Sequence, residues 1–417
     1  MLDFIKTALT AQKVDMLKVI TPANHVAAKQ EWLEQAMHGH FTNPQFTYAV
    51  DLKEAKAKLA EWSDISYAWR NDYSPKTTAE KLLYTLADDY IERQRLIRLI
   101  ALAIAVGDDT MTNSLMAKYY GKTDADLVEL AYKLADGMAT VNFPYLDEMP
   151  RKLSINQTKA CLDNVYEAKD IKRMFDAVLE DYGLQDTWKV VIDDVRSAIC
   201  VSGFTADGDS RVFIPATREV NEIKAIQLAG HEIENHVRHN ENCMALLSEN
   251  FDIPREIAAR LVADRDSKIT EGFAKMSDAV IGKRCLGITT GAPEPWYIIM
   301  ADLAAKGESF AQITERVCKE WNVDPEACWT HAIRIFRGCH DTTNPHSFSR
   351  QSDRSYLEGY VKAIKLNEEE SPLYDFAKFD EDTMAKITEL IGDPRQHVKY
   401  HHLGIANKIV SNIWLLV

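Results

Sequence analysis

The feature that most constrains this chain is the stretch HEIENHVRH at residues 231–239, which lies within a longer helical pattern. Apolar residues three or four apart, such as Ile233 and Val237, predict one continuous helix through it. His231 and His236 are five residues apart in that helix. Residues at this spacing in a regular α-helix point about 140° away from each other, so these two imidazoles would not meet at one ion.

A π-bulge would remove this difficulty, because it inserts one residue into a helical turn and brings position i+5 round to the direction of i+4. Gly230 and Asn235 are weak helix formers, which lowers the cost of such a distortion. We therefore predict a bulge near these residues, with His231 and His236 sharing a metal ion. Two interpretations compete with it. His236 and His239 face together without distortion, and the helix can also carry core and surface histidines without a metal.

The same stretch begins as the zinc-peptidase helix H-E-x-x-H does. Glu232 directly follows His231, so its carboxylate is expected beside a metal and not on it, which is the position of a general base. A third ligand is expected from a later helix, and Glu271 in TEGFA is the best candidate because Gly272 allows close helix approach. On spacing alone Glu271 does not outrank three other acids, which are Glu234, Glu249 and Asp264.

The chain is expected to fold as an α+β protein that is predominantly α-helical. Residues 1–180 show helical apolar spacing, with Thr77 or Thr78 as the cap of the longest helix and Gly107 at its end. Strand-like segments, WKVVIDDV, SAICVSGF and RVFIPA, lie between residues 188 and 216, and Asp207-Gly208 marks a hairpin turn. They predict a small sheet before the histidine helix, with RVFIPAT as the edge strand for a substrate and Thr217 as the helix cap.

Composition narrows the classes of partner. The formal net charge of −14 argues against binding to nucleic acid or to an anionic membrane, since both require a basic face. The N-terminus carries charges through its apolar stretch, unlike a signal peptide, and the apolar run 96–107 contains Arg98 and is too short to span a bilayer. The seven cysteines are odd in number and form no C-x-x-C pair, so reduced thiols in a cytoplasmic protein are expected.

Several stretches together resemble a known family. HEIENH followed by TEGFA is similar to the H-E-x-x-x-H metallopeptidases named in bacteria for a Q-E-G-L-A motif, whose animal relatives include the microtubule-associated tyrosine carboxypeptidases. ITPANHVAAKQEWL, NPQFTYA, YYGKTDADLVELA and RIFRG with SFSRQSDRSYLEGY resemble the same family. The resemblance covers residues 14–365. It implies a zincin-like fold, with a helical N-terminal region (1–180) packed on a catalytic region (181–417), in one continuous domain.

The resemblance also implies roles for individual residues. His231, His236 and Glu271 would bind Zn²⁺, and Glu232 would be the catalytic base. The chain departs from the family in two places. TEGFA replaces QEGLA but keeps the glutamate and glycine, and SFSRQSDRSYLEG matches the family's F-T-K-D-x-x-Y-L-x-G only with an insertion.

The expected activity is therefore that of a zinc metallopeptidase, a carboxypeptidase acting on the C-terminus of a peptide or protein. Such an enzyme needs a cation for the terminal carboxylate, and Arg334 and Arg337, three apart on a predicted helix, are candidates, with Tyr356 as a further donor. Two other functions stay open. One is a non-catalytic member that binds a peptide or partner in the same cleft, and the other is a zinc hydrolase of non-peptide amides. The sequence does not predict an oligomeric state.

Overall fold

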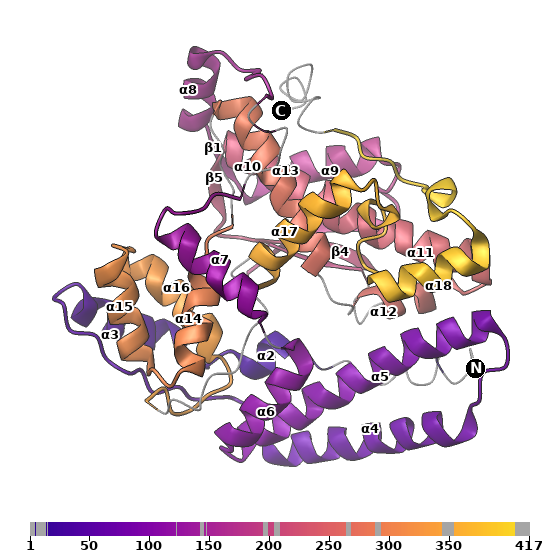
Figure 1. The fold of residues 1–417 in the computed structure, drawn as a ribbon, viewed down its shortest axis with the longest axis horizontal. Coiled ribbons are helices and arrows are strands. Elements are labelled where there is room, and N and C mark those ends of the chain that lie inside the picture. Colours follow the sequence, from indigo (N-terminus) through magenta and orange to yellow (C-terminus); the bar gives the residue numbers. More distant parts are fainter. Residues whose placement is uncertain are drawn as a thin grey trace.

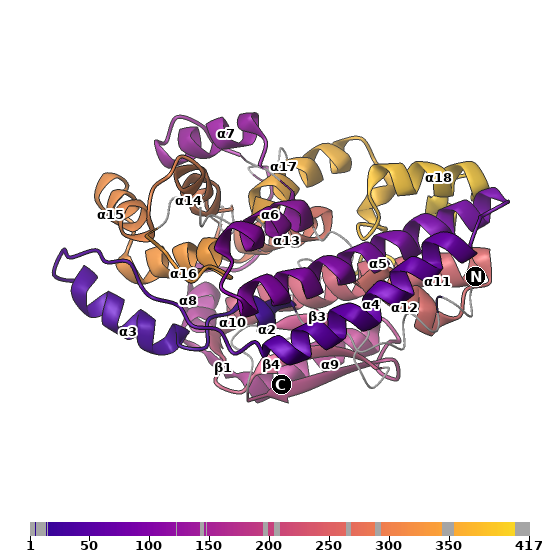
Figure 2. The ribbon, with the colours of Figure 1, turned by 90° about the horizontal axis from the view of Figure 1, so that it is seen from below.

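The fold is predominantly helical, with small sheets on one side of the molecule (Figures 1 and 2). It is seen in a computed structural model of the 417-residue chain. The structure describes residues 5, 14, 16–121, 123–141, 146, 148–194, 199–203, 209–263, 268–287, 293–343 and 354–404. The expected class, α+β and mainly α, is confirmed for these residues.

Helices make up the first part of the chain, as the apolar spacing predicts. The longest of them, α5, begins after Thr77, whose hydroxyl accepts the N–H of Glu80 while the Glu80 carboxylate accepts the N–H of Thr77. It ends at Ala105, and Gly107 then turns the chain with φ of 72°. α4 and α5 lie side by side in both ribbon views (Figures 1 and 2). The helices are α2 (Met16–Ile20), α3 (His25–Ala36), α4 (Leu52–Asp72), α5 (Thr78–Ala105), α6 (Asp109–Tyr120), α7 (Ala125–Ala135) and α8 (Ile155–Asp163).

The strands form two small sheets before the histidine helix, as predicted. β1 (Val165–Glu167) pairs antiparallel with β5 (Glu219–Asn221). The other sheet has the order β2-β4-β3 and consists of β2 (Trp188–Asp193), β4 (Ser210–Pro215) and β3 (Cys200–Ser202). β2 runs parallel to β4 and β3 runs antiparallel to it.

The expectation that RVFIPAT supplies an edge strand is wrong. This segment contains β4, which is central because β2 pairs along one side of it and β3 along the other. Val212, Phe213 and Ile214 are all buried in succession, which is typical of a strand covered on both faces. β3 is therefore an outer strand, and the predicted Asp207-Gly208 turn lies outside the described residues.

The second half of the chain is again helical. α10 begins after Asn221, whose side chain accepts the N–H of Lys224, so the prediction of Thr217 as the cap is wrong. The residues between them form β5 instead, because β1 offers a pairing partner there. The helices are α9 (Ala168–Asp181), α10 (Glu222–Ala229), the π-helix η1 (Gly230–Val237), α11 (Arg238–Phe251), α12 (Arg255–Ala263), α13 (Lys268–Leu286), α14 (Trp296–Ala305), α15 (Phe310–Glu320), α16 (Pro325–Phe336), α17 (Ser355–Glu368) and α18 (Glu381–Ile391), with short 3₁₀ turns η3 (Pro372–Tyr374) and η4 (Pro394–His397).

Buried apolar side chains form two large clusters. One joins α4, α5, α9, the larger sheet, α10–α13, α17 and α18. The other joins α3 and α7 to α14–α16, around the rings of Trp32, Phe310 and Trp329, which meet in edge-on or tilted contacts. Both clusters draw on elements from before and after residue 180, so the N-terminal helices complete the same core as the later ones.

α13 and α17 approach each other at two glycines. A Cβ on Gly272 would lie 1.9 Å from the carbonyl oxygen of Gly359, and a Cβ on Gly359 would lie 2.0 Å from the carbonyl oxygen of Lys268. Only residues without a side chain permit this backbone contact. The expected role of Gly272, to let the helix carrying Glu271 pack closely, is confirmed.

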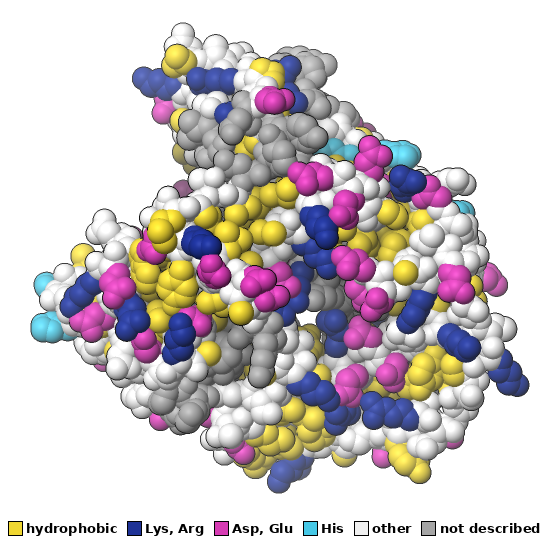
Figure 3. Space-filling model, in the orientation of Figure 1, with side chains coloured by type: hydrophobic (Ala, Val, Ile, Leu, Met, Phe, Trp, Pro, Cys, Tyr) yellow, Lys and Arg dark blue, Asp and Glu magenta, His cyan; other side chains and the backbone are white. Residues whose placement is uncertain are grey.

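Other broad expectations concern the surface and the thiols. All seven cysteines are free thiols, as their odd number and wide spacing predict. Within the described part of the chain, no helix combines the length and apolar content needed to cross a bilayer. The face shown in Figure 3 carries acidic and basic side chains intermixed.

Candidate metal centre

The centre is built on η1, the π-helix that joins α10 to α11. A π-helix closes i→i+5 hydrogen bonds, so it accommodates one more residue per turn than an α-helix. The rings of His231 and His236 consequently face each other, with centroids 5.0 Å apart. The predicted distortion of the helix between Gly230 and Asn235 is confirmed.

Two residues of η1 explain why the chain adopts this form. The Asn235 side chain donates to the carbonyl oxygen of Gly230 over 2.7 Å, which gives that backbone acceptor a partner within the widened turn. A Cβ on Gly230 would lie 2.6 Å from Ile281 and 2.8 Å from Ser277, both on α13. Gly230 thus brings η1 close to the helix that carries Glu271.

Glu271 reaches the two histidines from α13. Its two carboxylate oxygens lie 3.6 Å from His231 Nε2 and 3.5 Å from His236 Nε2. One candidate ligand atom from each of the three residues can be chosen so that all lie within 4.8 Å of one another. The structure therefore brings together the three predicted ligands, which lie on two helices.

This cluster fits a divalent metal ion in its geometry. Bonds of about 2.0–2.1 Å to a tetrahedral ion place neighbouring ligand atoms about 3.3 Å apart. The two distances of 3.5 and 3.6 Å, each to a different oxygen of Glu271, are close to this value, and one atom from each residue lies within 4.8 Å of the others. Glu271 Oε2 is buried and accepts no hydrogen bond from the described residues. Two imidazoles and one carboxylate are also a ligand set of catalytic zinc sites, which keep a fourth position open.

Asp278 belongs to the candidate centre and was missed by the sequence reasoning. Its carboxylate lies 3.3 Å from Nδ1 of His231, on the side of the ring opposite to Glu271. Such a partner fixes the orientation of a ligating histidine and leaves Nε2 free for the metal. The signal was available, because Asp278 follows Glu271 by seven residues, two helical turns, and so shares its face of α13.

The charges of the cluster depend on one another. Burial by itself lowers the pKa of His231, but Asp278 and Glu271 raise it, and the resulting pKa is about 10. For His236 burial dominates and lowers the pKa to about 3. Burial raises the pKa of Glu271, yet His236 and His231 outweigh it, and the pKa is about 2. Without a metal, the cluster therefore holds a proton on His231 at neutral pH.

Glu232 lies in the same turn and is nearly buried, with 8% of its surface exposed. Burial raises its pKa to about 7, and Glu271 and Asp278 add to this while His231 opposes it. A carboxylate with a pKa near neutrality can take up and give back a proton during one reaction cycle. The chemical role predicted for Glu232 thus agrees with its surroundings.

The competing ligands lie elsewhere. His239 is buried on another side of the helix, where its Nε2 lies 3.0 Å from the carbonyl oxygen of Tyr374. Among the described residues, the candidate metal group contains His236 but not His239, the pair that the sequence also offered. Glu234 pairs with His402 over 3.1 Å, Glu249 pairs with Lys399 over 2.9 Å, and Asp264 lies outside the described residues.

Tyr356, a predicted substrate contact, lies next to Lys275 and Tyr297. It lies in the first turn of α17, with its ring centroid 5.4 Å from Lys275 Nζ and 6.2 Å from the ring of Tyr297. Lys275 Nζ is in turn 3.4 Å from Asp278. A short series of contacts therefore connects Tyr356 to the residue that orients His231.

The two arginines proposed for carboxylate binding differ in position. The guanidinium of Arg334 lies 5.4 Å from the ring of Tyr297, one ring farther along the same series of contacts. α16 ends at Phe336, and Arg337 has a ψ of 130°, so the expected common helical face of the two arginines is absent. Gly338, which follows Arg337, donates its N–H to the hydroxyl of Tyr48. The chain just after α16 therefore lies against the N-terminal region.

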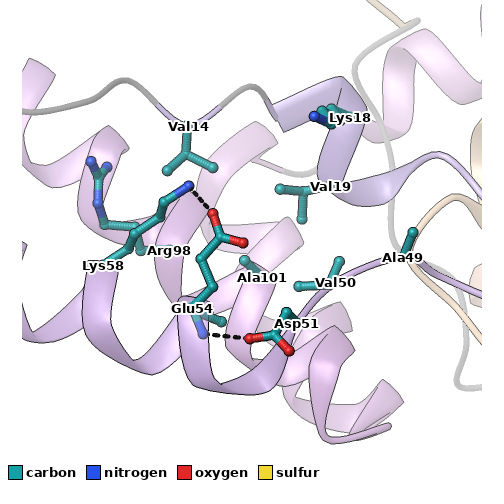
Figure 4. A pocket seen from close by; sticks show the side chains of 11 residues that line it. Val14, Lys18, Val19, Ala49, Val50, Asp51, Glu54, Lys58, Arg98 and Ala101 are labelled. Carbon is teal, nitrogen blue, oxygen red and sulfur yellow. Dashed lines mark hydrogen bonds and ion pairs between the residues drawn. The ribbon is translucent and has the colours of Figure 1, made fainter.

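A separate cavity of about 320 Å³ lies between α2, α4 and α5 (Figure 4). Apolar side chains and an ion pair between Lys58 and Glu54 line it, and Arg98 contributes to one wall. None of its lining residues belongs to the cluster of His231, His236 and Glu271. The cavity is therefore not part of the candidate metal centre.

The chain was also compared with known proteins. It matches no model of a known protein family. It matches none of the curated proteins either. The assignment of a metal centre consequently depends on the geometry of its own residues, and the resemblance to the Q-E-G-L-A metallopeptidases stays a prediction.

Proposed function

We propose that this protein is a zinc-dependent metallopeptidase that removes residues from the C-terminus of a peptide or protein substrate. The observation that carries the proposal is the convergence of His231, His236 and Glu271 on one point, with Glu232 in the same helical turn. A regular helix would have separated the two histidines, so the π-helix has a chemical consequence. The Q-E-G-L-A family, which the motifs resemble, has the same arrangement of residues.

A zinc ion bound by these residues would supply a Lewis acid that polarises a carbonyl and lets water ionise near neutral pH. Glu232 would accept the proton of the attacking water and return it to the leaving amine, which suits a pKa of about 7. Asp278 would keep the His231 ring in the orientation that presents Nε2.

A peptide substrate also needs an edge along which to align. β3 is an outer strand of the larger sheet and lies in contact with η1. An extended peptide can add to such an edge through main-chain hydrogen bonds. In this proposal β3 takes the role that the sequence suggested for the segment now seen as β4.

Two other functions compete with the peptidase. A non-catalytic member would bind a peptide or partner in the same cleft, but it has no need of a buried carboxylate beside the ligands, so Glu232 favours an enzyme. A zinc hydrolase of non-peptide amides would use the same four residues. A cytoplasmic location is proposed because none of the seven cysteines is in a disulfide, as is usual in a reducing compartment.

The metal assignment is tested by zinc content after dialysis of the purified protein. Wild type is expected to retain about one zinc per chain, and His236→Ala and Glu271→Ala are expected to retain almost none. Glu249→Ala is the matched control, because Glu249 is an exposed acid paired with Lys399 and should leave zinc content unchanged. Full zinc occupancy in both ligand variants would exclude this centre.

The activity is tested with peptides whose cleavage is followed by mass spectrometry. Glu232→Gln is expected to keep its zinc and to lose turnover by about 10²–10⁴-fold, the usual contribution of a general base. Zinc binding without cleavage of any peptide would favour the non-catalytic alternative. Cleavage of small amides but not of peptides would favour the amide hydrolase.

A further inference from the structure

The face of α13 that carries Glu271 also carries a cation. Lys275 follows Glu271 by four residues, one helical turn, and side chains at this spacing have Cβ atoms about 5–6 Å apart. Among the described residues its ammonium group contacts the carboxylate of Asp278, at 3.4 Å, and the ring of Tyr356. An ammonium has three N–H donors, so one long contact to a carboxylate leaves it able to bind a further anion.

Lys275 is partly exposed, as the side chains of Glu271 and His231 are. Its side chain is 26% exposed, and those of Glu271 and His231 are 18% and 13% exposed. All three side chains are therefore partly accessible to solvent. A molecule that enters beside Glu271 meets Lys275 within one turn of the same helix.

Charged groups of both signs surround Lys275: the carboxylates of Asp278, Glu271, Glu232 and Glu294 lie within electrostatic range of it, and Lys224 is a nearby cation. Lys224, in the first turn of α10, lies within electrostatic range of Lys275 and Arg218 as well as of Asp278 and Glu232, and burial together with the two cations lowers its pKa. A bound zinc ion would add two further charges. Together with Lys275, the ion would offset the neighbouring carboxylates and attract an anionic group.

The distance between a substrate's last peptide bond and its chain end indicates which anion Lys275 would meet. One extended residue spans about 3.3–3.6 Å, so a substrate whose last peptide bond lies at the cluster places its terminal carboxylate about one residue farther on. That is the region of Lys275, one turn beyond Glu271. An internal peptide segment would present only neutral amide groups there, and the ammonium would gain little from it.

Two aromatic rings, those of Tyr356 and Tyr297, lie beside Lys275 in sequence of contact. The ring of Tyr356 lies against Lys275, and the ring of Tyr297 lies next to that of Tyr356. Aromatic faces beside a cation offer apolar contact area for the last side chain of a peptide while the carboxylate meets the charge. The guanidinium of Arg334 contacts the ring of Tyr297, the next ring in this series of contacts.

We propose that Lys275 binds the free C-terminal carboxylate of the substrate and that Tyr356 forms the wall against which its last side chain packs. This inference rests on the proposed peptidase function. It makes Lys275 the residue that restricts the enzyme to chain ends.

The test compares two dansylated pentapeptide libraries of the same degenerate sequence, one with a free C-terminal carboxylate and one amidated. Binding is measured by fluorescence to zinc-loaded Glu232→Gln, which holds peptides without cleaving them. The free library is expected to bind about tenfold or more tightly than the amidated one, as a charge-assisted contact requires. In the same background Lys275→Met should reduce this ratio to about one, and Lys275→Arg should retain most of it.

Lys386→Met is the control, because Lys386 is exposed on α18, and it should leave the ratio unchanged. Zinc content of every variant separates loss of the carboxylate contact from loss of the metal. An unchanged ratio in Lys275→Met, equal binding of both libraries to the parent, or binding of neither library would overturn the proposal. Failure of wild type to cleave peptides, with the ratio still dependent on Lys275, would overturn the peptidase function and leave the carboxylate site.

Discussion

At the residue scale, the candidate centre includes the carboxylate of Asp278, which is not one of the three candidate ligands. Asp278 lies between His231 and Lys275, 3.3 Å from one and 3.4 Å from the other. One side chain therefore orients a candidate ligand and also adjoins the proposed carboxylate-binding cation. Its own pKa is lowered, because His231 and Lys275 outweigh the effect of its burial.

Replacing this carboxylate should weaken metal binding without removing a ligand. Asp278→Asn keeps the shape but removes the charge that orients and polarises His231, so zinc affinity is expected to fall by about tenfold to a hundredfold. The measurement is competition for zinc with a chelator of known affinity. Asp382→Asn, an exposed acid on α18, should leave affinity unchanged. Equal affinities in the two variants would show that Asp278 does not support the metal.

The raised pKa of His231 predicts how metal binding depends on pH. The ligand must be neutral to coordinate, and with a pKa of about 10 it carries a proton throughout the neutral range. Zinc binding near pH 7 should therefore release about one proton from His231, and affinity should rise about tenfold per pH unit between pH 6.5 and 8.5. Calorimetry in buffers of different ionisation enthalpy counts the protons. Asp278→Asn should release fewer, whereas no release from wild type would contradict the raised pKa.

At the element scale, η1 behaves as an α-helix that contains one extra residue. α10, η1 and α11 follow one another without a break, and the residues that flank η1, Ala229 and Arg238, have right-handed helical angles, so the π-helix changes the direction of side chains within a continuous helical segment. Asn235 supports this form by donating to Gly230. Removal of one residue should convert the segment to a regular helix.

Deletion of Asn235 is expected to retain the metal. It changes HEIENH to HEIEH, and in a regular helix the two histidines would then lie four apart and still face the same ion. Zinc content should stay near one per chain, whereas insertion of an alanine after Glu234 should abolish it because the histidines diverge. Circular dichroism of both variants checks that they fold. Loss of zinc to the same extent in both would show that the bulge itself, and not the direction of the histidines, is required.

How far the elements could be predicted differs from place to place. The π-helix was predictable because two chemically related residues at an impossible spacing leave few conformations to consider. The order of the sheet was not, since RVFIPAT has the composition of an edge or a central strand alike and only the pairing of β2 and β3 decides between them. Asn221 replaced Thr217 as a helix cap for a similar reason, namely that β1 supplies pairing partners from 52 to 56 residues earlier.

At the scale of the whole molecule, buried polar contacts attach the C-terminal part to α11, which follows the candidate metal centre. Arg238 is fully buried and pairs with Asp375, and it also donates to the carbonyl oxygen of Glu234. Asn242 holds the backbone of Tyr400 at both its N–H and its carbonyl oxygen. Sequence periodicity does not predict the contacts of Arg238 with Asp375 and of Asn242 with Tyr400, because each joins residues more than 130 positions apart and depends on the final packing.

Breaking the buried pair should destabilise the protein more than breaking an exposed one. Asp375→Asn leaves the Arg238 guanidinium buried without its counter-charge, and a loss of about 3 kcal/mol of unfolding free energy is expected. Asp393→Asn removes an exposed ion pair with Arg395 and should cost less than about 1 kcal/mol. Urea unfolding of the metal-free proteins compares them. Similar losses would mean that Arg238 finds another partner.

The mixed origin of the two apolar clusters has a consequence for synthesis on the ribosome. The apolar face of α3 emerges early, but α14–α16, which cover it, follow about 250 residues later. At roughly 5–20 residues per second, that face waits about 12 to 50 s for its partners. Trp32 and its neighbours are exposed during this interval, so the nascent chain presents a binding surface for chaperones that the finished protein no longer has.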